Sequence, residues 1–231
     1  MRKKLKRIKE AAKMENVFAD LDGLMGKPGD SSKGNWREFF KDGSLGKIAR
    51  AKARVVLELG CGAGHYTISL AQKYPKKNFI GIDRKGDRIW RGAKKAMELK
   101  LKNVFFMQAR AEHLERYFKK SEVGEIWITF PDPYPKPSRA GHRLTSHKFT
   151  PVYKLLLKKG GKVHLKTDNL TLFEYSIKTL TAGGFKLQKR INDVHGRKSA
   201  PPLLKITTYY EQKWMSKGKP IHYACFSPIA A

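Results

Sequence analysis

The sequence is short of cysteine, of acidic residues and of long apolar runs, and each shortage narrows what the protein can be. Its 231 residues include only two cysteines, Cys61 and Cys225, which lie far apart and form no CxxC pair. They cannot build a metal cage by themselves, so we expect no metal site and a reducing, cytoplasmic location. No window approaches about 18 apolar residues, and the basic amino terminus lacks the apolar core of a signal peptide. We therefore expect a soluble protein with no membrane span.

The shortage of acid is the strongest of these signals. The chain has 49 lysines and arginines against 20 aspartates and glutamates, which gives a formal charge of +29 and a pI near 10.2. Basic residues are spread along the whole sequence, which predicts a polyanionic partner, most commonly a nucleic acid. A membrane surface is the alternative.

The chain can build one full hydrophobic core, since 40% of its residues are hydrophobic. Residues 1–50 mix charge with Gly, Pro and Ser, as in GKPGDSSKGN. We interpret them as a basic amino-terminal arm and linker, with a short helix near residues 5–18. Residues 51–231 then form a single domain.

A regular alternation of strand-like and helix-like segments begins at Arg54. Short apolar runs bounded by turn residues predict strands at RVVLELG, NFIGID, NVFFMQA, GEIWITF and KVHLKTD. Helix-length segments such as 65–74 and 87–99 separate most of them. This alternation predicts an α/β fold with a mostly parallel sheet covered by helices on both faces. The later runs FKLQKRIND and PIHYACFS predict an antiparallel edge.

The first predicted strand ends in a glycine-rich loop that suits a ligand. Gly60, Gly62 and Gly64 follow Glu58, and Asp83 ends the next predicted strand. Glycines let the backbone turn tightly against a ligand, and an acid after the second strand can accept both hydroxyls of a ribose. An acid beside the loop would repel a pyrophosphate, but it suits the amino group and sulfonium of S-adenosylmethionine. A tight turn in some other α/β protein is the alternative.

This E-x-G-x-G-x-G pattern resembles motif I of the class I methyltransferases. The resemblance implies a Rossmann-like fold with a mostly parallel seven-stranded sheet, and S-adenosyl-L-methionine as the cofactor. It also implies that Glu58 and the glycine loop lie under the amino-acid end of that cofactor, while Asp83 holds its ribose.

The stretch FPDPYPKP, at residues 130–137, fixes an acid between two prolines. Proline restricts the residue before it, so we expect Asp132 to be held extended with little freedom. One carboxylate can accept hydrogen bonds from both N1–H and the exocyclic amine of a guanine, which leaves the N7 edge free. N7 already carries a lone pair, so Asp132 would position the base rather than remove a proton. Tyr134 would either stack on the base or pack beneath the loop.

Three separated motifs within residues 54–226 resemble the TrmB family of tRNA (guanine-N7-)-methyltransferases, which modify guanosine 46 in the variable loop. The motifs are FPDPYPKP with the later Arg143-Leu144, KTDN with LFEYS, and TYYE with KW and GKPI. The resemblance implies methyl transfer to tRNA, with Asp132 at the heart of the active site. It implies that the substrate guanosine contacts Tyr134, Lys136, Asp168, Thr208, Tyr209, Tyr210 and Glu211. It implies that the tRNA contacts Ser138, Arg139, His142 and Arg143.

Two departures from the family pattern concern charged residues. Where the family usually has an acid near the adenine, this sequence has Arg110. The cofactor would then meet the main chain of Arg110 and Ala111, or the side chain of Glu112 in place of the acid. The loop after the DPY motif is also less basic, reading PSRAGHR, so the hold on tRNA would depend more on the amino-terminal arm.

The sequence leaves other interpretations open. A methyltransferase of exocyclic amines, on adenine N6 or cytosine N4, would share the scaffold, and so would a non-catalytic RNA-binding protein. Asp168 would be no more than a helix cap if KTDN only starts the following helix. We expect a monomer or a homodimer.

Overall fold

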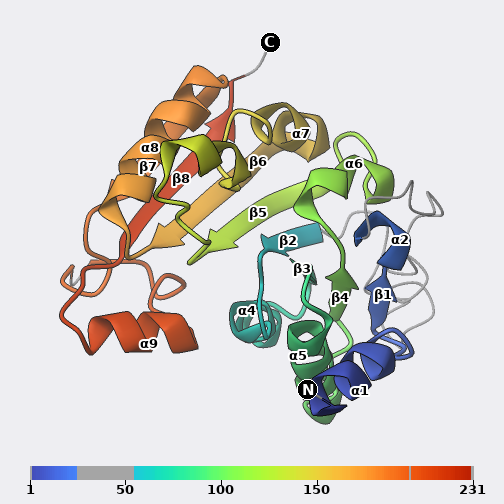
Figure 1. Ribbon diagram of the computed structural model, residues 1–231. Coiled ribbons are helices and arrows are strands. Elements are labelled where there is room, and N and C mark those ends of the chain that lie inside the picture. The colour runs from blue at the N-terminus through green and yellow to red at the C-terminus, as the bar shows by residue number, and fades with distance from the viewer. Residues whose placement is uncertain (1, 25–54, 198, 230–231) are drawn as a thin grey trace.

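All seven apolar runs form strands, and these hydrogen-bond into one mixed sheet (Figure 1). The structure is a computed structural model that describes residues 2–24, 55–197 and 199–229. Its strands are β1 (Val17–Ala19), β2 (Val55–Leu59), β3 (Asn78–Asp83), β4 (Val104–Gln108), β5 (Val123–Thr129), β6 (Leu157–Thr167), β7 (Phe185–Ile191) and β8 (His222–Pro228). Their order across the sheet is β1-β4-β3-β2-β5-β6-β8-β7. The predicted Rossmann-like α/β fold is confirmed.

The sheet has eight strands in the described ranges rather than the expected seven, because the amino-terminal arm adds one. β1 pairs in parallel with β4, with Val17 opposite Phe106 and Ala19 opposite Gln108. This strand covers the edge of β4, whose backbone groups would otherwise be unpaired. The helix before it, α1 (Arg2–Ala11), begins and ends earlier than the helix expected near residues 5–18.

The strands from β1 to β6 pair in parallel, and β8 is antiparallel to both of its neighbours, β6 and β7. The expected antiparallel strand therefore lies one place inside the edge, with β7 outside it. The two last runs do pair with each other as a neighbouring antiparallel pair, as their position at the end of the chain predicted.

Helices cover both faces of the sheet (Figure 1). After α1 they are α2 (Leu21–Leu24), α4 (His65–Lys73), α5 (Gly86–Glu98), α6 (Leu114–Tyr117), α7 (Thr150–Leu156), α8 (Leu170–Ala182) and α9 (Tyr209–Met215). Two 3-10 turns, η1 (Ala111–His113) and η2 (Pro137–His142), follow β4 and β5. The predicted helices at 65–74 and 87–99 agree with α4 and α5 to within one residue at each end.

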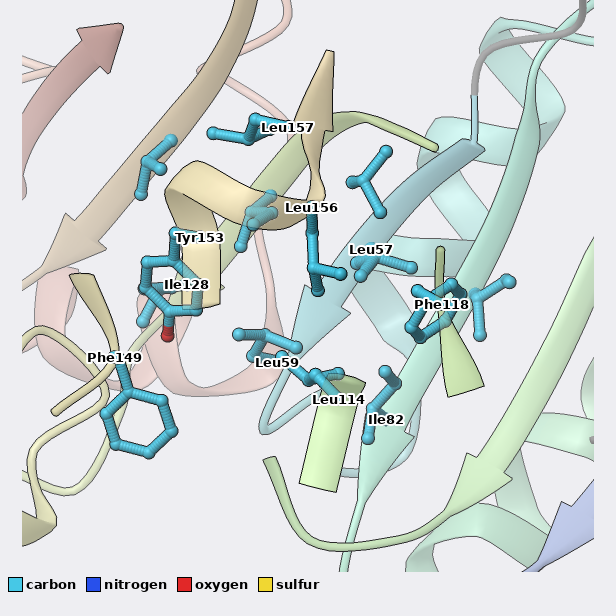
Figure 2. Close-up of a cluster of buried hydrophobic side chains, with 14 of the residues drawn as sticks. Leu57, Leu59, Ile82, Leu114, Phe118, Ile128, Phe149, Tyr153, Leu156 and Leu157 are labelled. Atoms are coloured by element: carbon cyan, nitrogen blue, oxygen red, sulfur yellow. The ribbon is translucent and has the colours of Figure 1, made fainter. Parts of the chain in front are cut away.

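Alternation along the strands divides the core into two clusters, one on each face. On β2, Leu57 belongs to one cluster and Val56 to the other, and Phe105 and Phe106 divide in the same way on β4. Figure 2 shows the first cluster, in which side chains of β2, β3 and β5 meet those of α6 and α7. Burying each large apolar side chain contributes about 1.5–3 kcal/mol, so both faces resist a slip in register.

The expected boundary between an arm (1–50) and a domain (51–231) falls within residues 25–54, outside the described residues, and it stays a prediction. The described part of the arm packs on β4 and α5. Through the ranges that the structure describes, no helix combines the length and the apolar character needed to cross a membrane.

Candidate active site

A cleft of about 800 Å³ lies where the parallel strands end. Open α/β sheets bind their ligands at this edge. The predicted residues that line it are Glu58, Gly60, Gly62, Asp83, Arg110, Ala111, Glu112, Asp132, Tyr134, His142, Asp168, Thr208 and Tyr210. The described ones that do not line it are Gly64, Lys136, Ser138, Arg139, Arg143 and Glu211. Tyr209 begins α9, and its side chain lies outside the described part.

The glycine loop has the left-handed backbone that glycine allows. Gly60, Gly62 and Gly64 have φ angles of 70°, 58° and 68°. A Cβ on Gly64 would lie 2.5 Å from the ring of Phe106, whereas a Cβ on Gly62 would meet nothing within 4 Å. Gly64 therefore permits close packing on β4, and Gly62 leaves bare main chain on the cleft wall.

Asp83 ties the glycine loop to the start of α5. One of its carboxylate oxygens accepts the N–H of Gly62 at 3.0 Å, and the other accepts the N–H of Lys85 at 2.8 Å. Both donors are uncharged, so the carboxylate keeps its negative charge on the cleft wall. Each oxygen also retains a lone pair, which suits the hydroxyls of a ribose.

Glu58 is 4% exposed and is held by neutral donors. One oxygen accepts the N–H of Thr67 at 2.8 Å and also the Thr67 hydroxyl, and the other accepts the hydroxyl of Thr129 at 2.5 Å. Burial raises the pKa of Glu58 above its ordinary value, although these hydrogen bonds oppose the rise. Within the described ranges Glu58 forms no ion pair, so it is suited to a ligand that brings a positive charge.

The segment after β4 supplies both candidates for the adenine side. Arg110 and Glu112 line the cleft, and their side chains approach each other to 4.0 Å. Both side chains are 40% or more exposed, so this ion pair is weak. The choice between them as a partner for the cofactor stays a prediction.

The turn that carries Asp132 is strained. Phe130 and Tyr134, on either side of it, have φ angles of 49° and 41°, which large side chains rarely adopt. Such residues cost about 1–3 kcal/mol each and persist only where the surroundings hold them. Asp132 lies between them as an exposed residue of the cleft wall.

Arg143 helps to stabilise this strained turn. Its Nε donates to the carbonyl of Pro133 and its Nη2 to the carbonyl of Tyr134, both at 3.0 Å. The guanidinium carbon also lies 4.1 Å from the ring centroid of Tyr175. Arg143 is buried at 6% exposure, so the expected contact with tRNA would require the guanidinium to leave both carbonyls.

The other residues expected to contact tRNA lie on or beside η2. Ser138 and Arg139 are exposed outside the cleft, and so is Lys136, which precedes the turn. His142 lines the cleft, with its ring centroid 5.5 Å from that of Tyr134. This turn therefore connects the cleft wall with the exposed surface.

Two neighbouring residues of the KTDN motif have different positions, one at the start of a helix and one on the cleft wall. Asn169, not Asp168, caps α8, because its Oδ1 accepts the N–H of Leu172 at 2.8 Å. Asp168 lines the cleft, where its Oδ2 lies 3.5 Å from Nζ of Lys219. The alternative that Asp168 only caps the helix is therefore wrong, and Asp168 is available to a ligand.

The TYYE motif forms a capping box at the start of α9. The Thr208 hydroxyl accepts the N–H of Glu211 at 3.1 Å, and the Glu211 carboxylate accepts the N–H of Thr208 at 3.4 Å. Thr208 lines the cleft, whereas Glu211 is fully buried. The capping box thus fixes the end of α9 that contributes Thr208 and Tyr210 to the cleft wall.

The charge of Glu211 is neutralised by partners inside the protein. It accepts from Nζ of Lys166 at 2.8 Å, and its other oxygen lies 2.7 Å from Nε2 of His195. Lys166 is fully buried and also donates to the carbonyls of Leu204 and Ile206. Burial lowers the pKa of Lys166, and the Glu211 carboxylate opposes that change. The expected contact of Glu211 with substrate would require it to leave these partners.

Comparison with known proteins places the chain in a family. Residues 52–224 match the family described as "Putative methyltransferase". A tRNA (guanine-N(7)-)-methyltransferase of Christiangramia forsetii is 43% identical over 225 residues, which cover 96% of each protein. That of Porphyromonas gingivalis is 44% identical over 173 residues, which cover 74% of this chain and 70% of that protein. The chain belongs to the TrmB family.

A solved structure supports the fold of this TrmB-family protein. It is titled as the structure of an antibiotic-related methyltransferase, and it superposes with a TM-score of 0.59 at 21% identity. The match covers 80% of this chain and 92% of that chain. At this identity the similarity shows a shared methyltransferase fold and nothing finer.

Sequence reasoning missed the residues that hold the TrmB motifs in place. Thr67 and Thr129 hold Glu58, Arg143 holds the turn after Asp132, and Lys166 holds Glu211. Only Lys166 gave a signal, because a lysine among the apolar residues at the end of a strand, two positions before Asp168, is unusual. The others are ordinary residue types, and their partners lie in other elements, 9 positions away for Thr67, 9 and 10 for Arg143 and 71 for Thr129.

Replacing Glu211 by alanine should destabilise this protein by about 3–5 kcal/mol, because the ammonium of Lys166 would stay buried without its partner. The free energy of unfolding from urea titration measures this. Glu174→Ala is the matched control: its carboxylate pairs with Arg190 at 2.5 Å, but both side chains are more than 40% exposed, so we expect a loss of about 0–1 kcal/mol. Equal losses in the two variants would contradict the role of the buried pair.

Proposed function

We propose that this protein transfers the methyl group of S-adenosylmethionine to N7 of guanosine 46, in the variable loop of tRNA. The observation that supports this most is the juxtaposition of two features on one cleft wall. One is a glycine loop with two buried acids held only by neutral donors, and the other is Asp132 on its strained turn. The names of the relatives, which match this chain at 43% and 44% identity, suggest the same reaction.

The residues of the glycine-loop side fit the cofactor chemically. Glu58 would face its amino group, Asp83 would accept hydrogen bonds from its ribose hydroxyls, and the bare main chain at Gly62 would let it approach closely. The segment Arg110–Glu112 would border the adenine. When bound, the cofactor supplies a methyl group on a positively charged sulfur. Glu58 and Asp83 favour that positive charge, because their own hydrogen-bond donors are neutral.

Asp132 would hold the guanine by its pairing edge. Its carboxylate would accept hydrogen bonds from N1–H and the exocyclic amine, which turns the N7 edge away from Asp132. Tyr134 and Tyr210 offer aromatic planes on the same cleft wall for stacking on a base taken out of its RNA stack. The strained turn and the two hydrogen bonds from Arg143 keep Asp132 in one place for this task.

The chemistry then requires positioning rather than proton removal. The N7 lone pair would accept the methyl group from the bound cofactor, whose sulfur would keep the electrons of the carbon–sulfur bond. The guanine gains a positive charge, which the carboxylates of Asp132 and Asp168 would stabilise. Holding two reactants in line can supply about 7–11 kcal/mol of the barrier.

Incubation of the protein with unmodified tRNA and labelled cofactor tests the reaction. Digestion to nucleosides should yield N7-methylguanosine as the labelled product, and cleavage mapping should place it at position 46. A label in N6-methyladenosine or N4-methylcytidine would instead indicate an exocyclic-amine methyltransferase. Binding of tRNA without any cofactor binding would leave a non-catalytic RNA-binding protein.

The Asp132→Asn variant should lose about 100-fold or more of kcat/KM, because two hydrogen bonds to a charged group contribute about 1.5–3 kcal/mol each. The amide nitrogen of asparagine also cannot accept from the guanine. Affinity for the cofactor, measured by calorimetry, should be unchanged. Asp22→Asn, at an exposed acid of α2, is the control and should keep full activity. An active Asp132→Asn variant would remove Asp132 from the mechanism.

Acid should weaken cofactor binding through Glu58. Its pKa lies above the ordinary 4.5 because of burial, so the carboxylate becomes neutral as the pH falls through that raised value. The attraction to the amino group is present above this pKa and lost below it. The dissociation constant should therefore rise in the wild type as the pH is lowered from 7.5 toward 4.5. In Glu58→Gln it should be higher throughout and nearly independent of pH, and a parallel rise in both proteins would show that another group is responsible.

A further inference from the structure

Two basic helices lie side by side at the β1 edge of the sheet. α1 packs against α5, and Figure 1 shows the two helices together, far from β7 at the other edge. The α1 segment has six basic residues and one acid between Arg2 and Ala11. Six basic residues and two acids lie between Arg84 and Glu98.

The contact between the helices brings like charges together. Trp90 of α5 has the guanidinium of Arg7 at 5.0 Å from its ring centroid and the ammonium of Lys94 at 5.1 Å. Cation–π attraction favours each contact, but two cations on one ring repel each other. The described ion pairs that relieve the charge within the helices are Lys6 with Glu10 at 3.9 Å and Lys95 with Glu98 at 3.5 Å, all exposed or partly exposed. A chain that gathers uncompensated cations in this way is suited to a polyanion.

The basic surface is continuous with the cleft. Arg84, Arg88, Arg91 and Lys95 follow one another at intervals of three or four residues, so they lie along one face of α5 and of the loop before it. The first three of them also line the cleft. Lys94 and Lys95 then continue toward α1, where Lys3, Lys4, Lys6 and Lys9 are exposed.

The orientation of α1 favours a nucleic acid over a membrane. A helix that lies on a membrane turns its apolar face outward to the lipid. In α1 the apolar side chains Ile8 and Ala11 are partly or fully buried, and Leu5 is the exposed apolar residue. The outward face is therefore mainly lysine, which matches the regularly spaced phosphates of an RNA backbone.

We propose that α1 and the exposed face of α5 form a second docking surface for tRNA, which binds the phosphate backbone outside the modified loop. This inference rests on the proposed function, because it assigns the substrate's remote part to a surface that adjoins the cleft. The surface supplies affinity and places the tRNA, while the cleft reads the guanine. It also takes over the charge that the sparsely basic turn η2 does not provide.

Neutralising α1 tests the surface. The variant Lys3→Gln, Lys4→Gln, Lys6→Gln and Lys9→Gln should weaken tRNA binding about tenfold near physiological salt, and should reduce the slope of log affinity against log salt by about 2–4. KM for tRNA should rise by a similar factor, while kcat and cofactor affinity stay within twofold. The matched control replaces four exposed lysines toward the opposite edge, Lys159, Lys178, Lys186 and Lys189, and should change the slope far less.

A second variant on α5, Lys94→Gln with Lys95→Gln, keeps the test decisive if α1 fails to fold after substitution. It should reduce the slope by about 1–2, with an unchanged circular dichroism spectrum. Slopes equal to that of the control in both variants would overturn the proposal. So would loss of binding to anionic phosphatidylserine vesicles with tRNA binding intact, which would indicate a membrane surface. Failure of the wild type to methylate tRNA would refute the proposed function instead. The slopes of log affinity against log salt would still show whether this surface binds tRNA.

Discussion

The site depends on one constraint, which is that the central parallel strands end in register with one another. Leu59 of β2 lies opposite Ile82 of β3 and Ile128 of β5, and Ile128 lies opposite Leu165 of β6. The loops that follow these strands therefore start from one line, and their side chains meet in one cleft. Packing on both faces fixes this alignment, since a slip by one residue would exchange the two faces of a strand. The geometry of the site is thus a consequence of the core.

The few acids of this basic chain differ in what neutralises them, and the difference separates their roles. Glu58 and Asp83 are held by backbone N–H groups and hydroxyls, which leave the net negative charge in place. Glu211 is held by the ammonium of Lys166, which cancels its charge within the core. An acid with uncharged partners can still attract a cationic ligand, whereas an acid paired with a buried cation mainly positions the chain around it.

Patterns local in the sequence predicted most of the fold and the centre of the site. Strand runs, the glycine loop and the proline-flanked Asp132 depend on residues within a few positions of one another. The structure forms the predicted strands and puts residues of the glycine loop and Asp132 on the wall of one cleft, while their roles stay predictions. One miss involves a distant partner. Glu211 lies 45 positions from Lys166, so its burial leaves no local mark. Arg143 is a different case, because its carbonyl acceptors lie only 9 and 10 positions away, but an arginine in a loop looks like a surface charge until those acceptors are known. β1 is three residues long, too short for a periodic pattern.

The distribution of charge is also consistent with the proposed combination of RNA binding and selective chemistry in one small domain. Phosphate contacts are long-ranged and insensitive to sequence, so they are most useful on an exposed surface such as that of α1 and α5. Reading a base requires carboxylates, which would repel the backbone if they faced the same surface. The acids Glu58 and Asp83, which would bind the cofactor, are buried in the cleft wall, whereas Asp132, which would hold the base, is an exposed residue of that wall. Arg88 and Arg91 of α5 line the same cleft, so positive charge would draw a polyanion toward it, and a base taken out of its stack would reach Asp132.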